Sequence, residues 1–248
     1  MSMSGGFVAV ALGLMLLKLY TWAAVVRTQS SLPLNGLYLL FTALMLWSYA
    51  RAMRSRLASR KPLNTDSPQL SERVTRYCER CDADKALHVH HCSVCNRCVY
   101  RMDHHCPWTG NCVAWSNKKF FLLFLLYTSL SCLVFNAMAS PLVWDARFRR
   151  YESLLKCGWA LSLGVGLLLA GYFVFHLWLL REGKTTLEFL AGKRGELADC
   201  SFTHNVTVYF GRDVGSWWLP TMPMLDAAMG GRRERDDDGE EMLQLVVE

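Results

Sequence analysis

The sequence predicts an α-helical integral membrane protein with four transmembrane helices and a cytosolic cysteine-rich domain between the second and third helix. Three observations predict this fold class. Four long stretches are nearly free of charge, the basic residues are spread unevenly over the segments that connect them, and seven of the ten cysteines lie within residues 78–112. A hydrophobic content of 52% does not alone distinguish a membrane protein from a soluble one. The concentration of the hydrophobic residues in four stretches does.

The four apolar stretches have the length of membrane spans. A helix needs about 20 apolar residues to cross the ~30 Å hydrocarbon core of a bilayer. Residues 32–50, 120–144 and 158–180 contain no Asp, Glu, Lys or Arg, and residues 7–26 contain only Lys18. Buried helices of a soluble protein are the alternative, but charge-free runs of this length exceed the usual globular helix. No basic residue precedes the first stretch, so we expect a retained span and not a cleaved signal peptide.

Basic residues predict the orientation, because connecting segments rich in Lys and Arg stay in the cytosol. The segments after the second and fourth stretches are the richest, with Arg51, Arg54, Arg56, Arg60 and Lys61 in one and Arg181, Lys184, Lys193 and Arg194 in the other. The segment between the third and fourth stretches also carries four basic residues, which argues weakly the other way. We therefore expect both termini and the cysteine-rich domain in the cytosol.

The predicted organisation has four parts. These are two transmembrane helices in residues 1–50, a cytosolic linker and cysteine-rich domain in residues 51–119, two further transmembrane helices in residues 120–180, and a cytosolic C-terminal region in residues 181–248. Residues 59–71 have the composition of a linker, and the charge-dense residues 224–248 predict a disordered tail. The net charge of +6 suits an anionic bilayer surface. No nucleic-acid partner is expected, because no basic stripe alternates with aromatic residues outside the membrane-flanking segments.

The cysteine-rich segment has the ligand pattern of two zinc sites. Two tetrahedral sites need eight ligands, and the segment supplies Cys78, Cys81, His91, Cys92, Cys95, Cys98, His105 and Cys112. In the reducing cytosol such cysteines more often bind metal than form disulfides. Two structural Zn²⁺ ions would replace the core that so short a segment lacks, and its Cys-x-x-Cys pairs favour turns and short strands. Spacing alone leaves open which ligand binds which ion, and His88 and His90 are nearby competitors of His91.

One cysteine, Cys106, remains after eight ligands are assigned, and it follows Asp103, His104 and His105. A free thiol has a pKa near 8.5, so a neighbouring imidazole is needed to take its proton, and a carboxylate can orient that imidazole. Alternate residues of an extended segment project to the same side. His104 and Cys106 would then share one side, and His105 would face the other, toward a metal. We therefore expect Cys106 as nucleophile, His104 as general base and Asp103 as its orienting partner.

The run Asp103-His104-His105-Cys106-Pro107-Trp108 resembles the signature of the DHHC-type protein S-acyltransferases, also called palmitoyltransferases. The resemblance covers residues 72–124 and, through weaker motifs, residues 184–211. It implies the four-span topology and a two-step reaction. Cys106 takes a long acyl chain from a fatty acyl-CoA such as palmitoyl-CoA, and cysteine thiols of membrane-associated proteins then receive it. The partners would be acyl-CoA, such protein substrates and the lipid bilayer.

The resemblance also implies how the zinc ligands pair. A sequential pairing would divide the eight ligands into the first four and the last four. The resemblance implies interleaved sites instead, one formed by Cys78, Cys81, His91 and Cys98 and the other by Cys92, Cys95, His105 and Cys112.

Several residues are candidates for contacts with acyl-CoA. By resemblance, Trp108, Phe121 and Phe124 face the acyl chain, although aromatic residues are also common where helices meet a membrane interface. Ser131, deeper in the third apolar stretch, would lie near the closed end of the chain's cavity and admit a longer chain. The CoA phosphates would bind basic residues at the cytosolic face, and the candidates are Lys118, Lys119, Arg181 and Lys184. The alternative is that these residues are ordinary anchors at the membrane interface.

Three further motifs support the resemblance. Thr185-Thr186-Leu187-Glu188 matches the family's T-T-x-E motif, which packs near Asp103, and is also a capping box that would start a helix. Asn205 matches an asparagine that caps cytosolic ends of the spans, and Asn117 matches the position after the last ligand.

The sequence thus predicts a four-span protein-cysteine S-palmitoyltransferase with a cytosolic two-zinc domain, in the endoplasmic reticulum, the Golgi or the plasma membrane. A membrane-anchored zinc scaffold without turnover is the main alternative, but a scaffold does not require the additional cysteine Cys106. A membrane ubiquitin ligase is another, but it would need longer spacing between its ligand pairs.

Overall fold

The computed structural model describes residues 3–57, 74–86, 88–195 and 197–223. The predicted linker at 59–71 and the predicted tail at 224–248 lie outside the described residues. The chain forms two compact units. The first comprises residues 1–50, 107–110 and 120–178, and the second comprises residues 51–106, 111–119 and 179–248.

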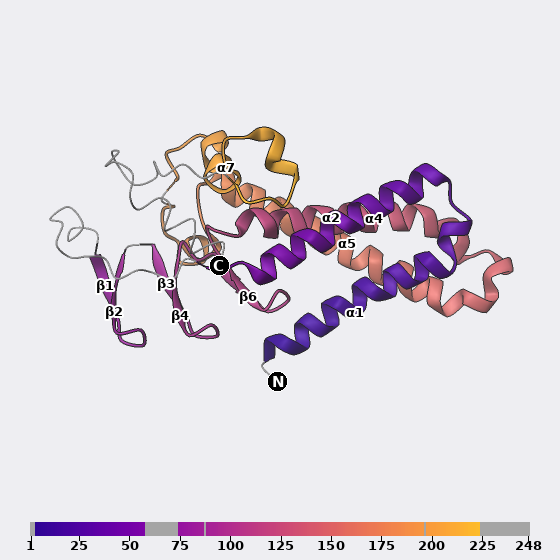
Figure 1. Ribbon diagram of the computed structural model, residues 1–248, viewed down its shortest axis with the longest axis horizontal. Helices are drawn as coiled ribbons and strands as arrows, with labels where there is room; N and C mark the ends of the chain where they lie inside the picture. Colours follow the sequence, from indigo (N-terminus) through magenta and orange to yellow (C-terminus); the bar gives the residue numbers. More distant parts are fainter. Residues whose placement is uncertain (1–2, 58–73, 87, 196, 224–248) are drawn as a thin grey trace. The chain divides into compact units, whose positions relative to one another are not determined.

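Four long helices form the first unit and extend a few residues into the second. They are α1 (Met3–Ala24), α2 (Leu32–Arg54), α4 (Lys118–Val143) and α5 (Glu152–Arg181), and 3₁₀ turns η1 (Val26–Thr28) and η2 (Ala146–Tyr151) follow α1 and α4 (Figure 1). By length and composition, four helical segments can cross a membrane: residues 4–28, 32–54, 118–143 and 146–181. The described residues therefore contain four candidate membrane helices, the number that the sequence predicts.

The helices are longer than the apolar stretches that predicted them. Helix α5 begins at Glu152, before the apolar stretch that starts at Gly158, and its first turns include an exposed ion pair between Glu152 and Lys156. Helix α2 likewise continues past Ala50 to Arg54. Charged residues end an apolar stretch without ending the helix that contains it.

The helices pack through a core of buried apolar side chains. Tyr38 is fully buried, and its ring lies 5.2 Å from that of Trp22 and 6.1 Å from that of Phe135. Val134 and Met138 of α4 belong to the same cluster. These contacts bring α1, α2 and α4 together.

A polar cluster lies inside the same four-helix unit. Lys18 of α1 donates from Nζ to Oγ of Ser131 in α4 at 2.9 Å, and Ser131 Oγ lies 2.9 Å from Oγ1 of Thr42 in α2. All three residues are buried, with exposed fractions of 6% or less. A charged side chain within a span faces the bundle because lipid offers it no partner. Lys18 does so here.

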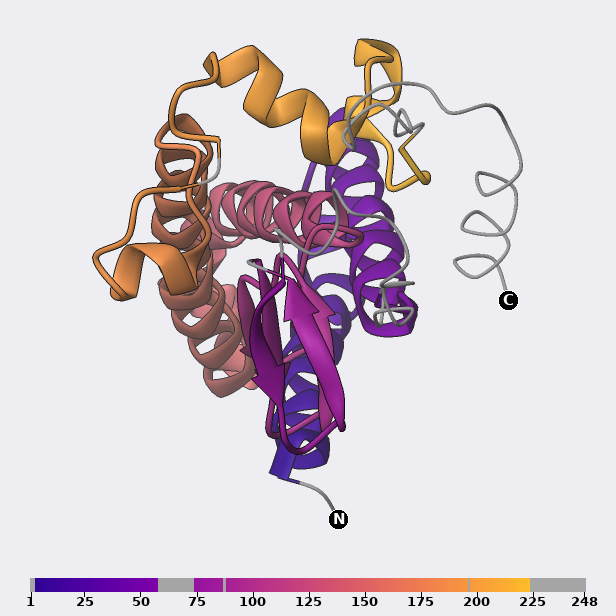
Figure 2. The same cartoon turned by 90° about the vertical axis from the view of Figure 1, so that its left-hand side faces the viewer.

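The second unit contains three antiparallel hairpins and three short helical segments. The hairpins pair β1 (Val74–Cys78) with β2 (Ala83–Ala86), β3 (Val89–Cys92) with β4 (Arg97–Tyr100), and β5 (His104–Cys106) with β6 (Asn111–Val113). The segments α6 (Thr186–Leu190), α7 (Phe202–Phe210) and η3 (Val214–Trp218) follow α5. The hairpins succeed one another in a row (Figure 1), which Figure 2 views from the end of the first hairpin. Short strands between turns were predicted for this segment, and the structure has them.

A glycine sets how closely α5 approaches α4. A Cβ atom at Gly166 would lie 2.7 Å from Cβ of Cys132, a separation that requires the helices to move apart, whereas a Cβ at Gly164 meets no atom within 4 Å. Small residues at such positions let membrane helices pack closely.

We expect Gly166→Ala to destabilise the protein by about 1–3 kcal/mol, because the added methyl overpacks the contact between α4 and α5. Thermal unfolding in detergent measures the change. Gly164→Ala is the matched control and should be neutral or slightly stabilising, because alanine favours the helix over glycine. Equal melting temperatures for the two variants would contradict the close approach.

Candidate functional site

The first two hairpins carry the same cysteine turn. Each contains a Cys-x-x-Cys pair followed by a residue in the left-handed region, Asp82 at φ 49° and Asn96 at φ 50°. Aspartate and asparagine tolerate this conformation better than most residues. In the second turn the backbone N–H of Cys95 donates to Sγ of Cys92 at 3.4 Å. The turns therefore hold two sulfurs close together at the end of each hairpin.

Strand register completes each group of donor atoms. His91 pairs directly with Cys98 across the second hairpin, and His105 pairs with Cys112 across the third. The first group joins the turn of the first hairpin to the cross-strand pair of the second, and the second group repeats this one hairpin later. The structure thus groups Cys78, Cys81, His91 and Cys98, and separately Cys92, Cys95, His105 and Cys112, with all ligand atoms of a group within 4.8 Å of one another. This grouping is interleaved along the chain.

The donor separations fit a tetrahedral metal ion. Nδ1 of His105 lies 3.7 Å from Sγ of Cys92, 3.4 Å from that of Cys95 and 3.6 Å from that of Cys112. In a tetrahedral zinc site, ligand bonds of about 2.0–2.3 Å place ligands about 3.5–3.8 Å apart. Every one of these cysteines is a free thiol. Burial, and then the nearby charge of His104, lower the pKa of His105, which favours the neutral imidazole that binds metals.

The third hairpin repeats the pattern without completing it. Cysteines end the first strand of each hairpin at positions 78, 92 and 106, and left-handed residues follow at positions 82, 96 and 110, where Gly110 has φ 63°. The spacing is 14 residues throughout. At position 109, where the repeat would place a second cysteine, the chain has Thr109. Cys106 therefore occupies the place of a first ligand in a turn that lacks the second.

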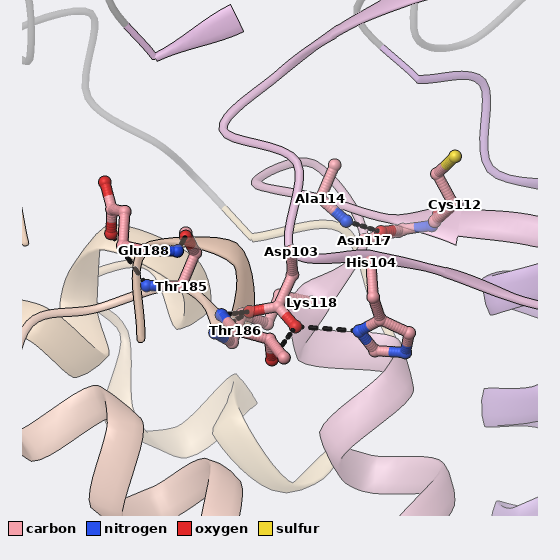
Figure 3. A network of polar contacts seen from close by, with 9 residues as sticks. All are labelled: Asp103, His104, Cys112, Ala114, Asn117, Lys118, Thr185, Thr186 and Glu188. Carbon is pink, nitrogen blue, oxygen red and sulfur yellow. Dashed lines mark hydrogen bonds and ion pairs between the residues drawn. The ribbon is translucent and has the colours of Figure 1, made fainter. Parts of the chain in front are cut away.

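Asp103 lies at the centre of a polar network with His104, Lys118 and Thr186 (Figure 3). Its carboxylate is fully buried and has contacts at both oxygens. Oδ2 lies 2.7 Å from Nδ1 of His104 and accepts from Oγ1 of Thr186 at 2.6 Å, and Oδ1 accepts from Nζ of Lys118 at 2.7 Å and from the backbone N–H of Thr186 at 3.2 Å. Both oxygens are thus held in place.

His104 is the imidazole between this carboxylate and the Cys106 thiol. Burial disfavours the imidazolium, but hydrogen bonds to Asp103 and then to Cys106, with the charges of both groups, outweigh burial and raise the pKa of His104 to about 9. The cysteine is also buried, with 6% of its surface exposed. A carboxylate, an imidazole and a thiol in sequence can generate a thiolate nucleophile.

The T-T-x-E segment plays both predicted parts. Thr185 and Glu188 form a reciprocal capping box at the start of α6, with Thr185 N–H donating to Glu188 Oε2 at 2.8 Å and Glu188 N–H donating to Thr185 Oγ1 at 3.2 Å. Thr186 is the residue that contacts Asp103 (Figure 3). The cap fixes the turn from which Thr186 reaches the carboxylate.

Two predicted asparagines bind backbone groups. Asn117 accepts from Ala114 N–H at 2.8 Å and donates to the Cys112 carbonyl at 2.9 Å, which orders the turn after the last ligand. Asn205 of α7 donates to the Leu180 carbonyl at 2.9 Å, at the C-terminal end of α5. Both side chains are buried.

Sequence reasoning missed a third asparagine. Asn111 donates from Nδ2 to the carbonyls of Ala52, Met53 and Ser55 at 3.1, 3.3 and 2.9 Å, and its Oδ1 accepts from the Cys112 N–H at 3.0 Å. It therefore satisfies the C-terminal carbonyls of α2 from the strand that carries a metal-ligand candidate. An asparagine directly before the last cysteine was the available signal.

The candidate acyl-chain residues lie in the first unit. Trp108 accepts at its carbonyl from Oη of Tyr49 at 2.7 Å, and the Tyr49 ring lies 5.1 Å from that of Phe124. Phe121 is buried and its ring lies 5.9 Å from that of Tyr172. Ser131 belongs to the polar cluster with Lys18 and Thr42. Three separate sets of contacts thus hold these candidates.

The two adjacent lysines differ from the expected arrangement. Both are 1% exposed, and their ammonium groups already bind protein acceptors: Lys118 binds Asp103, and Lys119 donates to the Ser216 carbonyl at 2.9 Å. A lysine that binds a phosphate group of a ligand is expected to present its ammonium to solvent. Arg181 is exposed and Lys184 partly exposed, so these two remain candidates for the CoA phosphates.

Comparison with known proteins extends this description. Residues 71–193 match the DHHC palmitoyltransferase family. The chain is 38% identical to palmitoyltransferase ZDHHC15A of Danio rerio over 156 residues and 38% identical to palmitoyltransferase ZDHHC2 of Mus musculus over 160, covering 58% of this chain and 48% and 43% of those proteins. It is 43% identical to palmitoyltransferase pfa3 of Aspergillus fumigatus over 127 residues, which cover 48% of this chain and 23% of that protein.

The chain spans less than half the length of each of these relatives. The matched segment nevertheless contains both donor groups, Asp103, His104, Cys106 and the T-T-x-E segment. The chain belongs to the DHHC palmitoyltransferase family.

Proposed function

We propose that this chain is a protein S-acyltransferase that moves a long-chain acyl group, typically palmitoyl, from acyl-CoA through Cys106 to cysteine thiols of membrane-associated proteins. The observation that carries the proposal is the ordered set Asp103, His104 and Cys106, whose thiol stands outside both donor groups. The palmitoyltransferase names of the relatives agree with it.

The first step loads the enzyme. His104 takes the proton of Cys106, and the thiolate attacks the thioester carbonyl of acyl-CoA. The carbon–sulfur bond to CoA breaks as the bond to Cys106 forms, and the CoA thiolate leaves and takes the proton from His104. Asp103 orients the imidazole and stabilises its charged form. One thioester replaces another, so the step needs no ATP.

The second step transfers the chain. His104 removes the proton of a substrate cysteine, the new thiolate attacks the acyl group on Cys106, and the Cys106 thiolate leaves and is protonated again. The same imidazole thus acts as base toward Cys106 in the first step and toward the substrate cysteine in the second, so it serves both acylation and deacylation.

We propose that each donor group holds one Zn²⁺ ion with a structural role. Zinc would bind the four ligands of each group and so stabilise the hairpins that carry them. His105 is one of the ligands and directly precedes Cys106, so metal binding would fix the strand that bears the nucleophile.

The proposed placement in the membrane follows the basic residues. Residues 1–50 and 120–180 would provide the four spans, residues 51–119 and 181–248 would lie in the cytosol with both termini, and the compartment would belong to the endomembrane system. Burial of each methylene contributes about 0.8 kcal/mol, which favours an acyl chain within the span bundle. Trp108, Phe121 and Phe124 would contact it, and Arg181 and Lys184 would meet the CoA phosphates.

The first prediction concerns acyl loading. Purified protein in detergent, given alkyne-tagged palmitoyl-CoA, should acquire hydroxylamine-sensitive label that Cys106→Ser abolishes, and His104→Ala should slow loading by about 10²–10⁴-fold because the general base is lost. Cys157→Ser, which removes an exposed cysteine, is the control and should load normally. Equal label on Cys106→Ser would refute the proposed carrier and favour a non-catalytic zinc scaffold.

The second prediction concerns metal content. Atomic emission should find two zinc ions per chain, one for each donor group, and Cys95→Ser should lower the content and the melting temperature, because a ligand is lost. Chelation of the wild type should lower the melting temperature in the same way. Cys157→Ser should retain both ions. A folded wild type that contains no zinc would contradict this assignment.

The third prediction concerns chain length. Ser131 is fully buried, and Ser131→Tyr should shift preference toward shorter acyl-CoAs, because the larger side chain would shorten the cavity. Competition between acyl-CoAs of different length measures the preference. Leu133→Tyr in the same helix, at a side chain that is 67% exposed, is the matched control. An unchanged preference in Ser131→Tyr would rule out a role for this residue.

A further inference from the structure

Lys118 forms a buried ion pair with the carboxylate beside the nucleophile. Its Nζ lies 2.7 Å from Oδ1 of Asp103, and the side chains are 1% and 0% exposed. The ammonium also lies 5.1 Å from the centre of the Tyr209 ring. Neither the T-T-x-E segment nor the Asp-His-His-Cys run includes Lys118, so neither motif assigns it a role.

We propose that Lys118 is a positioning residue of the acyl-transfer site, which holds Asp103 as the charged, fixed carboxylate that orients His104. The inference rests on the proposed function. It replaces the expectation that Lys118 binds a CoA phosphate.

The contacts of Asp103 divide between its two oxygens. Lys118 and the Thr186 N–H bind Oδ1, and His104 and the Thr186 hydroxyl bind Oδ2. Lys118 therefore occupies the oxygen that His104 does not use. The two oxygens of a carboxylate are equivalent, so the contact to the ammonium fixes the plane of the group and not the identity of either oxygen. The ion pair thus holds the carboxylate in the plane that presents its other oxygen to the imidazole.

Charge balance supports the same assignment. A buried carboxylate without a counter-charge is costly, and removal of one partner of a buried pair is more damaging than the pair's net contribution suggests. Lys118 supplies a buried cationic partner to Asp103 at 2.7 Å, from a side chain that takes no part in the proposed proton transfers. The aromatic face of Tyr209 gives the ammonium a second favourable neighbour.

The experiment separates positioning from phosphate binding. Loading of Cys106 by palmitoyl-CoA is measured for the wild type, Lys118→Met and Lys118→Arg, with Lys156→Met as a control that removes a lysine from an exposed ion pair. We expect Lys118→Met to lower kcat about tenfold or more with little change in KM, and Lys118→Arg to restore much of kcat. A raised KM with unchanged kcat would instead assign Lys118 to the CoA phosphates and overturn the inference.

A double-mutant cycle with Asp103→Asn completes the test. If Lys118 acts through Asp103, Lys118→Met should have little further effect in the Asp103→Asn background, and additive losses would overturn the inference. Zinc content and melting temperature report folding, and Lys118→Gln, which keeps a donor, replaces Lys118→Met if the latter does not fold. Normal loading by Lys118 variants would refute this inference alone. Absence of loading in the zinc-bound wild type would refute the proposed function as well.

Discussion

The pairing of His105 with Cys112 across the third hairpin is the constraint on which the candidate site depends. It directs His105 into a donor group and, because side chains alternate along a strand, leaves its two neighbours for other contacts. Those neighbours are His104 and Cys106. The remaining contacts then follow: Asp103 receives His104 on one oxygen and Lys118 on the other, and Thr186 reaches both oxygens from a capped helix start. The Cys106 thiol is thus positioned mainly by backbone geometry.

The 14-residue repeat gives a physical reason why the Cys106 thiol lies in this turn of the third hairpin. Three hairpins share a cysteine at the end of their first strand and a left-handed residue four positions later. Two of them supply Cys-x-x-Cys pairs. In the third, Thr109 stands at the second position, and a hydroxyl is a poor substitute for a thiolate toward zinc. Cys106 consequently retains the preorganised turn of a metal ligand while its sulfur is left available for His104.

Much of the fold and of the candidate site was predictable from the sequence, because these features depend on patterns among residues that are close in the chain. Apolar stretches predicted four helices, alternation along an extended strand predicted that His104 and Cys106 would face away from His105, and Thr185 with Glu188 matched a capping box. Helix α5 extends beyond the predicted apolar stretch, because its first turns carry charged residues that a hydropathy pattern does not include. The contacts of Lys118 and Asn111 were not predicted, because their partners, Asp103 and the end of α2, are distant in sequence. Long-range polar contacts leave no periodic signal.

The buried position of Lys18 bears on how the chain enters a membrane. A lysine at the centre of an isolated span costs about 2.5–3.5 kcal/mol on translocon-insertion scales. Its acceptor, Ser131, belongs to α4, which a ribosome makes more than a hundred residues later. Until α4 is made, the ammonium group of Lys18 in α1 lacks the Ser131 hydroxyl as its hydrogen-bond acceptor. The hydrogen bond that satisfies Lys18 in the folded protein therefore forms only after α4 has been made.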